Sequence, residues 1–173
     1  HIPDETSWLF ELVNWIGTTL VAAAVTVTFG LLFLVLRQPV AAVLTLLTFP
    51  LRLLNSVLKA IFDSPRPSEA VVRVTEIADG LGFPSGHAMG AMLLYGMLFI
   101  LAPRLTASRP LQVAFRIAAM TTIILAGVSR IYVGAHWPSD VLGGYLWGLI
   151  TLLGAGMAVR FCLRQTRIGR SQG

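Results

Sequence analysis

Charged residues are scarce in this chain, at 12% of its 173 positions, whereas soluble domains carry about 25%. The few charges are also unevenly spread, because Leu12–Leu36 and Val141–Val159 contain none. A helix needs about 20 mainly apolar residues to cross the hydrocarbon core of a bilayer. The scarcity excludes an ordinary soluble core and indicates an all-α, polytopic membrane protein. We expect residues 1–173 to form a single membrane-embedded domain.

Cysteine is almost absent as well. Cys162 is the only one in the chain, which excludes an internal disulfide and a cysteine-rich metal site. The net charge of +5 raises the question of nucleic acid. However, most basic residues lie near the ends of apolar segments rather than in a patch with interleaved aromatic residues. We therefore expect the bilayer, and no nucleic acid, as the partner of these charges.

The apolar runs predict five spanning helices joined by short polar segments. Their expected bounds are Thr18–Leu36, Val40–Phe62, Gly86–Leu101, Leu111–Val128 and Pro138–Phe161. Residues 1–15 are expected to form an outer-side segment that is amphipathic over Trp8–Trp15, residues 63–84 an outer loop, and residues 160–173 a cytoplasmic tail. We also expect a further helix before His1, which would bring the bundle to six spans.

The distribution of arginine predicts how the helices are oriented, since basic residues are retained on the cytoplasmic side. With alternating spans, one face receives Arg37, Arg104, Arg109 and the arginines of the tail, and all eight acidic residues fall on or near the other face. We therefore expect a multi-pass protein of the bacterial inner membrane, with its C-terminus in the cytoplasm and its polar loops outside.

Three polar clusters fall on that outer face. Their chemistry-bearing members are Lys59 and Arg66 in the first, Ser85, Gly86 and His87 in the second, and Arg130, His136 and Asp140 in the third. Fixed positive charge is what phosphoryl transfer requires, because the transferring group spreads negative charge over its oxygens. A helix that begins after Ser85 would add free backbone N–H groups. The convergence predicts a phosphoryl-transfer site.

Two histidines suit a two-step transfer, in which one attacks phosphorus and the other protonates the leaving oxygen. A carboxylate in the first turn after Pro138 would lie close to His136 and hold its imidazole. Taken singly, each residue has an ordinary interpretation: Lys59 as an interfacial lysine, His136 as part of an aromatic belt, and Asp140 as a first-turn charge. None of these interpretations predicts that all would coincide on one face.

The three clusters also carry motifs that resemble those of the type 2 phosphatidic acid phosphatases, or lipid phosphate phosphatases. The motifs are Lys59 followed after six residues by Arg66-Pro67, then Pro84-Ser85-Gly86-His87, then Ser129-Arg130 followed by His136 and Asp140. All three are intact and in order, and the similarity covers about Leu51–Gly156. One such motif would be weak support, but three in order are highly specific.

The resemblance implies a role for each residue. His136 matches the nucleophile that forms a phosphohistidine, Asp140 its orienting carboxylate, and His87 the general acid. The residues that match the phosphate-binding set are Lys59, Arg66, Ser85, Gly86 and Arg130. No metal or other cofactor is implied, and no obligate protein partner is evident.

The expected activity is removal of phosphate from a membrane lipid. Undecaprenyl diphosphate, phosphatidylglycerol phosphate and phosphatidate are the candidate substrates. One alternative keeps the chemistry but passes the phosphoryl group to a second lipid, as a phosphotransferase. A more remote alternative is a non-enzymatic channel or transporter that binds anions.

Two polar residues lie outside the motifs but share a helical face with Lys59. Arg52 is three residues before Asn55, and Asn55 is four residues before Lys59, all within the second span. Intramembrane charges usually face the bundle interior. We interpret Arg52 and Asn55 as a possible secondary contact for substrate, weighed equally against a structural role for Arg52. Gly144 and Gly148, like Gly86 and Gly90, are spaced for close helix packing.

Overall fold

In the computed structural model, helices are the only regular secondary structure among the residues that are described. The described residues are 12, 15, 17–68, 70–72, 74–76 and 79–171, with 163–171 described by their backbone alone. The helices are α2 (Thr19–Val35), α3 (Pro39–Leu51), α4 (Leu54–Phe62), α5 (Gly86–Leu105), α6 (Arg109–Tyr132) and α7 (Pro138–Ser171). The predicted all-α class is confirmed. Most of the expected amphipathic segment Trp8–Trp15 lies outside the described residues.

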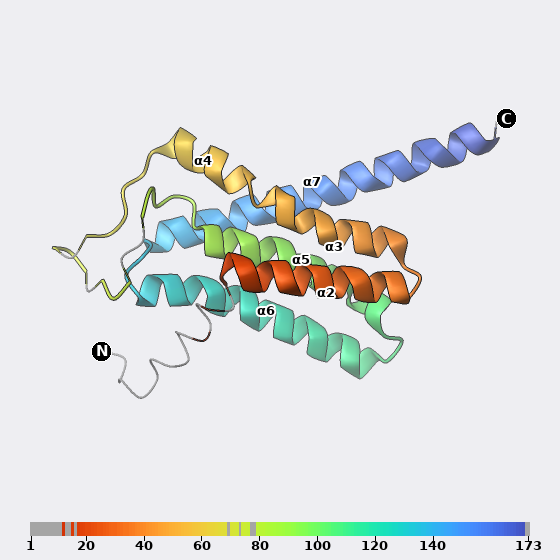
Figure 1. Ribbon diagram of the computed structural model, residues 1–173, viewed down its shortest axis with the longest axis horizontal. Coiled ribbons are helices and arrows are strands. Elements are labelled where there is room, and N and C mark those ends of the chain that lie inside the picture. Colours follow the sequence, from red (N-terminus) through yellow and green to blue (C-terminus); the bar gives the residue numbers. More distant parts are fainter. Residues whose placement is uncertain are drawn as a thin grey trace.

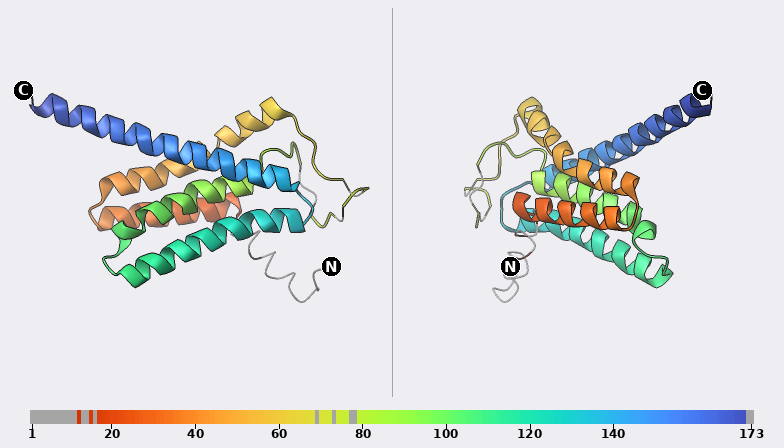
Figure 2. Two further views of the ribbon diagram at one scale, coloured as in Figure 1. Left: turned by 180° about the vertical axis from the view of Figure 1, so that it is seen from behind. Right: turned by 45° about the vertical axis from the view of Figure 1, so that its right-hand side comes forward.

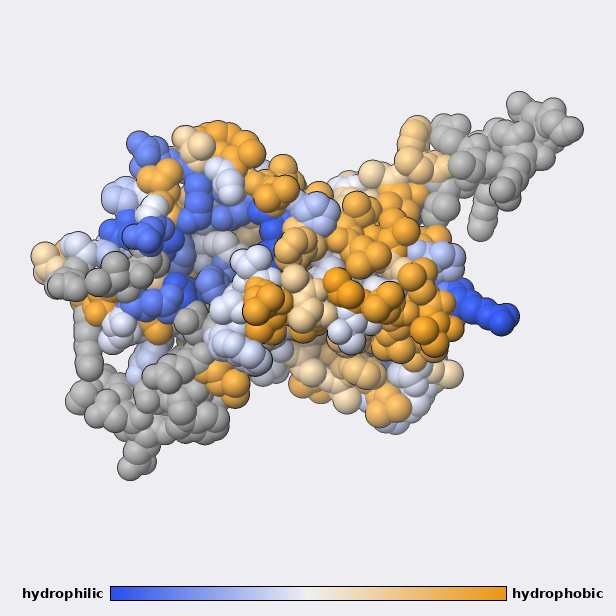
Figure 3. Space-filling model, viewed as in Figure 1, coloured by the Kyte–Doolittle hydropathy of each residue, from blue (hydrophilic) through white to orange (hydrophobic). Residues whose placement is uncertain are grey.

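Four helical stretches are long and apolar enough to cross a bilayer. They are Pro39–Phe62, which joins α3 to α4, then Gly86–Leu105, Arg109–Tyr132 and Pro138–Cys162. The fifth expected span, α2, has 17 residues and is therefore about 26 Å long, slightly less than the hydrocarbon thickness. Large apolar side chains cover the outside of the bundle, as Figure 3 shows over the helical part of the molecule, and Leu20 is 80% exposed. Lipid would cover such a surface.

Helix α5 is the centre of the bundle. It packs against α3, α6 and α7 (Figure 1), and it supplies much of the buried core, including Met89 and Leu93. Helix α7 lies close to α5 because Gly144 and Gly148 carry no side chain. A Cβ at Gly144 would lie 2.7 Å from the Ser85 carbonyl oxygen. The expected close packing at these two glycines is confirmed.

The second predicted span is not one continuous helix, contrary to expectation. It breaks at Arg52 and Leu53 between α3 and α4, where the backbone N–H groups bond to carbonyls three residues back. Pro50 explains the break, since proline has no N–H and its ring crowds the carbonyl four residues earlier. Figure 1 shows α4 leaving the line of α3.

Three helices extend past their predicted ends, of which α5 continues to Leu105. Helix α6 continues to Tyr132, so Ser129 and Arg130 lie in its last turn rather than in a loop. Helix α7 continues through the expected tail to Ser171, because its sequence there contains mainly good helix formers and no proline. The reversal between α2 and α3 is tight, with Arg37 at φ 55° and Pro39 as the first residue of α3.

We expect Gly144→Ala to destabilise the protein, because the added Cβ would meet backbone atoms of α5 that cannot rotate away. The cost of such overpacking is about 1–3 kcal/mol. Thermal unfolding in detergent should therefore give a lower midpoint than wild type. Gly154→Ala is the matched control on the same helix, since a Cβ there meets no atom within 4 Å. Equal midpoints for the two variants would contradict the packing argument.

Candidate active site

The three polar clusters meet at one end of the bundle. Helices α4 and α6 end there and α5 and α7 begin there, as the two views of Figure 2 show. A backbone hydrogen bond from the Ser85 N–H to the Asp140 carbonyl, 2.9 Å long, joins the start of α5 to the first turn of α7. The second and third clusters are thereby fixed against each other.

His136 and Asp140 form the buried pair that the sequence predicts. The His136 Nδ1 lies 3.3 Å from the Asp140 Oδ2, and the two residues are 4% and 1% exposed. The Trp137 backbone N–H donates to the same carboxylate oxygen at 3.0 Å. Because α7 begins at Pro138, Asp140 lies in its first turn and points back to His136. With a proton on Nδ1 donated to Asp140, Nε2 of His136 carries the lone pair.

Arg66 faces that second nitrogen. Its Nη1 lies 3.2 Å from the His136 Nε2 and donates to the Ala135 carbonyl at 2.8 Å. The carbonyls of Gly80 and Asp79 accept from its Nε and Nη2 at 3.0 and 3.1 Å. Three carbonyls therefore orient one guanidinium toward Nε2. Burial, followed by the positive charge of Arg130, lowers the pKa of Arg66.

Arg130 makes a bidentate ion pair with Glu76, which was not predicted from the sequence. The Arg130 side chain is 3% exposed, and its Nη1 and Nη2 each lie 3.1 Å from a carboxylate oxygen of Glu76. Glu76 is one of several acidic residues in the loop between α4 and α5, and no local pattern distinguishes it from the others. Its neighbour Thr75 is bonded through its backbone to the Val133 carbonyl, which holds this part of the loop against the end of α6.

Ser85 precedes α5 as predicted, but its hydroxyl does not cap the helix. The Ser85 backbone is in the N-cap position with no side-chain cap bond, and the residue is fully buried. Its Oγ has no hydrogen-bond partner among the described residues. An unsatisfied buried hydroxyl costs about 1–3 kcal/mol, so this group is poised for a ligand acceptor.

Lys59, Asn55 and Arg52 all face α5 or the loop before it, despite the break in their helix. Lys59 donates to the Leu81 carbonyl. The Asn55 side-chain nitrogen donates to the Pro84 carbonyl at 3.1 Å, which ties α4 to the Pro84-Ser85-Gly86-His87 motif. Arg52 lies against Gly90.

The charge around His136 is strongly positive. Burial, and then the charges of Arg66, Arg130, Lys59 and His87, lower the pKa of His136 to about 3. The imidazole is therefore neutral, and hence nucleophilic, at ordinary pH. The three cations and His87 therefore all act on one imidazole, as the sequence predicts.

Comparison with known proteins agrees with this geometry. Residues 38–164 match the PAP2 superfamily. The chain is 34% identical over 151 residues to phosphatidylglycerophosphatase B of Bacillus subtilis, covering 83% of this chain and 71% of that protein. A shorter stretch of 66 residues is 35% identical to a lipid A 1-phosphatase of Rhizobium etli, covering 38% of this chain and 24% of the relative.

A solved structure shares the fold as well. It is the crystal structure of a transmembrane PAP2-type phosphatidylglycerolphosphate phosphatase from Bacillus subtilis, with a TM-score of 0.74 and 30% sequence identity. The similarity covers 86% of this chain and 75% of that one. The matched residues 38–164 include every residue of the three clusters. The chain belongs to the PAP2 superfamily.

Proposed function

We propose that this member of the PAP2 superfamily, a phosphatase of membrane lipids, works through a phosphohistidine on His136 and acts at the outer face of a bacterial inner membrane. The observation that carries the proposal is the geometry of one imidazole. Its Nδ1 lies 3.3 Å from Asp140 and its Nε2 lies 3.2 Å from the Arg66 guanidinium. A lone pair thus faces a cation that would hold a phosphate oxygen.

In the first step, the lone pair of His136 Nε2 attacks phosphorus, and the bond from phosphorus to the leaving oxygen breaks. His87, as an imidazolium beside the bound phosphate anion, gives its proton to that oxygen, which leaves with the bonding electrons as an alcohol or a lipid phosphate. Asp140 accepts the Nδ1–H bond throughout and stabilises the positive charge that forms on the imidazole.

In the second step, a water molecule attacks the phosphorus of the phosphohistidine and transfers a proton to His87. The phosphorus–nitrogen bond breaks, its electrons return to Nε2, and inorganic phosphate leaves. Both histidines regain their starting protonation states.

The remaining residues of the clusters would bind the phosphoryl oxygens. Arg66 and Arg130 supply planar guanidinium groups, Lys59 a point charge, and Ser85 a buried hydroxyl without a partner among the described residues. The first N–H groups of α5, after Gly86, add the positive end of a helix dipole. Such preorganised charge is worth most in a site that excludes water. Phosphatidylglycerol phosphate, undecaprenyl diphosphate and phosphatidate are the candidate substrates.

We expect detergent-purified protein to release inorganic phosphate from at least one of these lipids in excess EDTA. His136→Ala should reduce the rate by about 10³-fold or more, because the attacking nitrogen is lost. A colorimetric phosphate assay measures the release. Retention of the phosphate on a second lipid would instead indicate a phosphotransferase. Full anion transport by His136→Ala, with no turnover by wild type, would support the channel alternative.

We expect His136 to stay neutral far below the usual histidine pKa. The unfolded chain takes up a proton near pH 6.5 whereas the folded His136 does so near 3, so folding stability from this residue is full above pH 6.5 and is lost progressively toward pH 3. NMR of histidine-labelled protein should show a neutral imidazole with its proton on Nδ1 at pH 5. Arg66→Ala removes a positive charge next to His136 and should therefore raise the midpoint of the His136 titration. A wild-type midpoint near 6.5 would contradict this.

We expect Glu76→Gln to strengthen inhibition by inorganic phosphate. In the substrate-free site, the Glu76 carboxylate binds both terminal nitrogens of the Arg130 guanidinium. Phosphate must therefore displace this carboxylate to bind Arg130. Because the Glu76 side chain is 38% exposed, the effect is modest, about two- to fivefold in the inhibition constant. Asp79→Asn is the control, since it removes a charge from the same loop without touching Arg130. A weaker inhibition in Glu76→Gln would show that the ion pair instead orients Arg130 for phosphate.

A further inference from the structure

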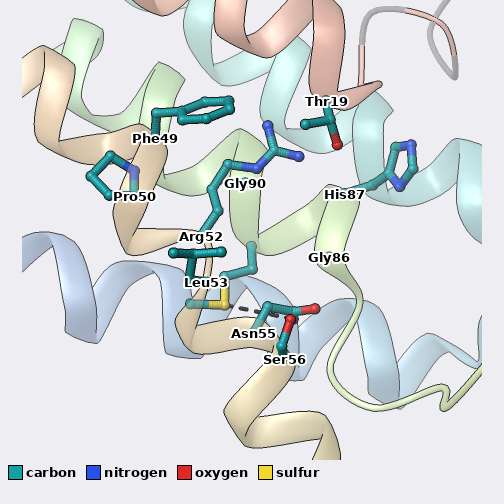
Figure 4. A pocket seen from close by; sticks show the side chains of 11 residues that line it. Thr19, Phe49, Pro50, Arg52, Leu53, Asn55, Ser56, Gly86, His87 and Gly90 are labelled. Atoms are coloured by element: carbon teal, nitrogen blue, oxygen red, sulfur yellow. Dashed lines mark hydrogen bonds between the residues drawn. The ribbon is translucent and has the colours of Figure 1, made fainter.

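Arg52 projects into a cavity inside the helical bundle. The cavity has a volume of about 430 Å³ and lies between the start of α2, the break from α3 to α4, and the first turns of α5. Figure 4 shows the Arg52 guanidinium crossing Gly90 toward the side of the cavity where Thr19 and His87 lie. This volume falls within the range of small-molecule sites in proteins.

The structure makes room for this guanidinium, which lies near the Tyr95 phenol but has no carboxylate partner among the described residues. A Cβ at Gly90 would lie 2.8 Å from the Arg52 Cζ, so a larger residue could not stand there. Within the described part of the chain, no hydrogen bond or ion pair involves the Arg52 side chain. By contrast, Arg66 has three carbonyl partners and Arg130 has a carboxylate. Charges at membrane depth are costly unless a partner or a functional ligand compensates them.

The depth of Arg52 relates it to the phosphoryl-transfer site. It lies seven residues before Lys59, at the break between α3 and α4 and therefore farther from the loops that carry the three clusters. His87, the proposed acid for the leaving oxygen, lines the same cavity. The leaving group is the part of the substrate on the lipid side of the reacting phosphorus. A negative charge on that part would therefore lie between His87 and Arg52.

We propose that Arg52 binds a second phosphate group of the lipid, so that the site selects lipids with two phosphates over lipids with one. The inference rests on the proposed phosphatase function and specifies its substrate class. An isoprenyl diphosphate and phosphatidylglycerol phosphate both carry a second phosphate on the leaving side. Phosphatidate does not, because its leaving group is an uncharged diacylglycerol alcohol.

Asn55 takes a different part in this arrangement. Its side-chain nitrogen is directed to the Pro84 carbonyl and to the sulfur of Met89, and its oxygen faces Gly86. An amide oxygen repels phosphate oxygens, since both are acceptors. Asn55 is thus a positioning residue for the start of α5, and Arg52 alone supplies the second charge.

The test compares phosphate release from isoprenyl diphosphate, phosphatidylglycerol phosphate and phosphatidate in identical mixed micelles. In Arg52→Met, the ratio of kcat/KM for each two-phosphate lipid to that for phosphatidate should fall at least about tenfold, the equivalent of one charge-assisted hydrogen bond. Arg52→Lys keeps the charge and should retain most of the ratio. Arg116→Met is the matched control: Arg116 also lies within a span, but it is held by the Phe99 carbonyl and ring, and its loss should leave the ratio unchanged.

An unchanged ratio in Arg52→Met, or an equal fall for all three lipids, would overturn the inference, the latter by showing a structural role. Should Arg52→Met not fold, inhibition of the wild type by methylenediphosphonate and by methylphosphonate decides the question. We expect an inhibition constant at least tenfold lower for the diphosphonate, and equal constants would overturn the proposal. Failure of the proposed phosphatase function can be distinguished from failure of the Arg52 proposal. In the former case, His136→Ala would retain phosphate release, or the wild type would release no phosphate from any lipid.

Discussion

The hydrogen bond from the Ser85 N–H to the Asp140 carbonyl is the contact on which the site depends. It joins the start of the central helix to the first turn of α7, and Gly144, one turn farther along α7, lets the two helices approach until backbone atoms nearly touch. The start of α5, which we propose binds phosphate, and the Asp140 carboxylate that contacts His136 are thereby fixed against each other. Arg130 and the loop before α5 are then arranged around it.

The cations of the site are held mainly by neutral carbonyl oxygens rather than by carboxylates. Lys59 bonds to Leu81, and Arg66 bonds to Asp79, Gly80 and Ala135, in each case through a backbone carbonyl. A carbonyl satisfies a donor and fixes its direction but leaves the positive charge uncompensated. The site therefore keeps a net positive field, which, after burial, is the second cause of the low pKa of His136. Glu76 on Arg130 is the exception, and it lies at the exposed edge of the site.

Much of this arrangement could be predicted from the sequence because the informative patterns are local. The apolar runs predicted the helices. The position of Asp140 in the first turn after Pro138 predicted its contact with His136. Three features depend on tertiary packing and could not be predicted from the sequence. The break at Arg52 depends on how Pro50 is accommodated, and the pairing of Glu76 with Arg130 joins residues that are 54 positions apart. The Ser85 hydroxyl could have capped α5, and only the packing of its surroundings leaves it without a partner among the described residues.

The break between α3 and α4 also has a consequence for how the site responds to its surroundings. Helix α4 carries Lys59, yet none of its residues is buried, and its far end is held by the contact of Phe62 with Phe83 and Trp147. A proline hinge separates it from the helix behind. Besides these ring contacts and the hydrogen bonds of Asn55 and Lys59 to the Pro84 and Leu81 carbonyls, the acyl chains of the bilayer would therefore provide lateral support for this helix. The position of Lys59, a proposed phosphate-binding charge, would then depend in part on the thickness and lateral pressure of the bilayer.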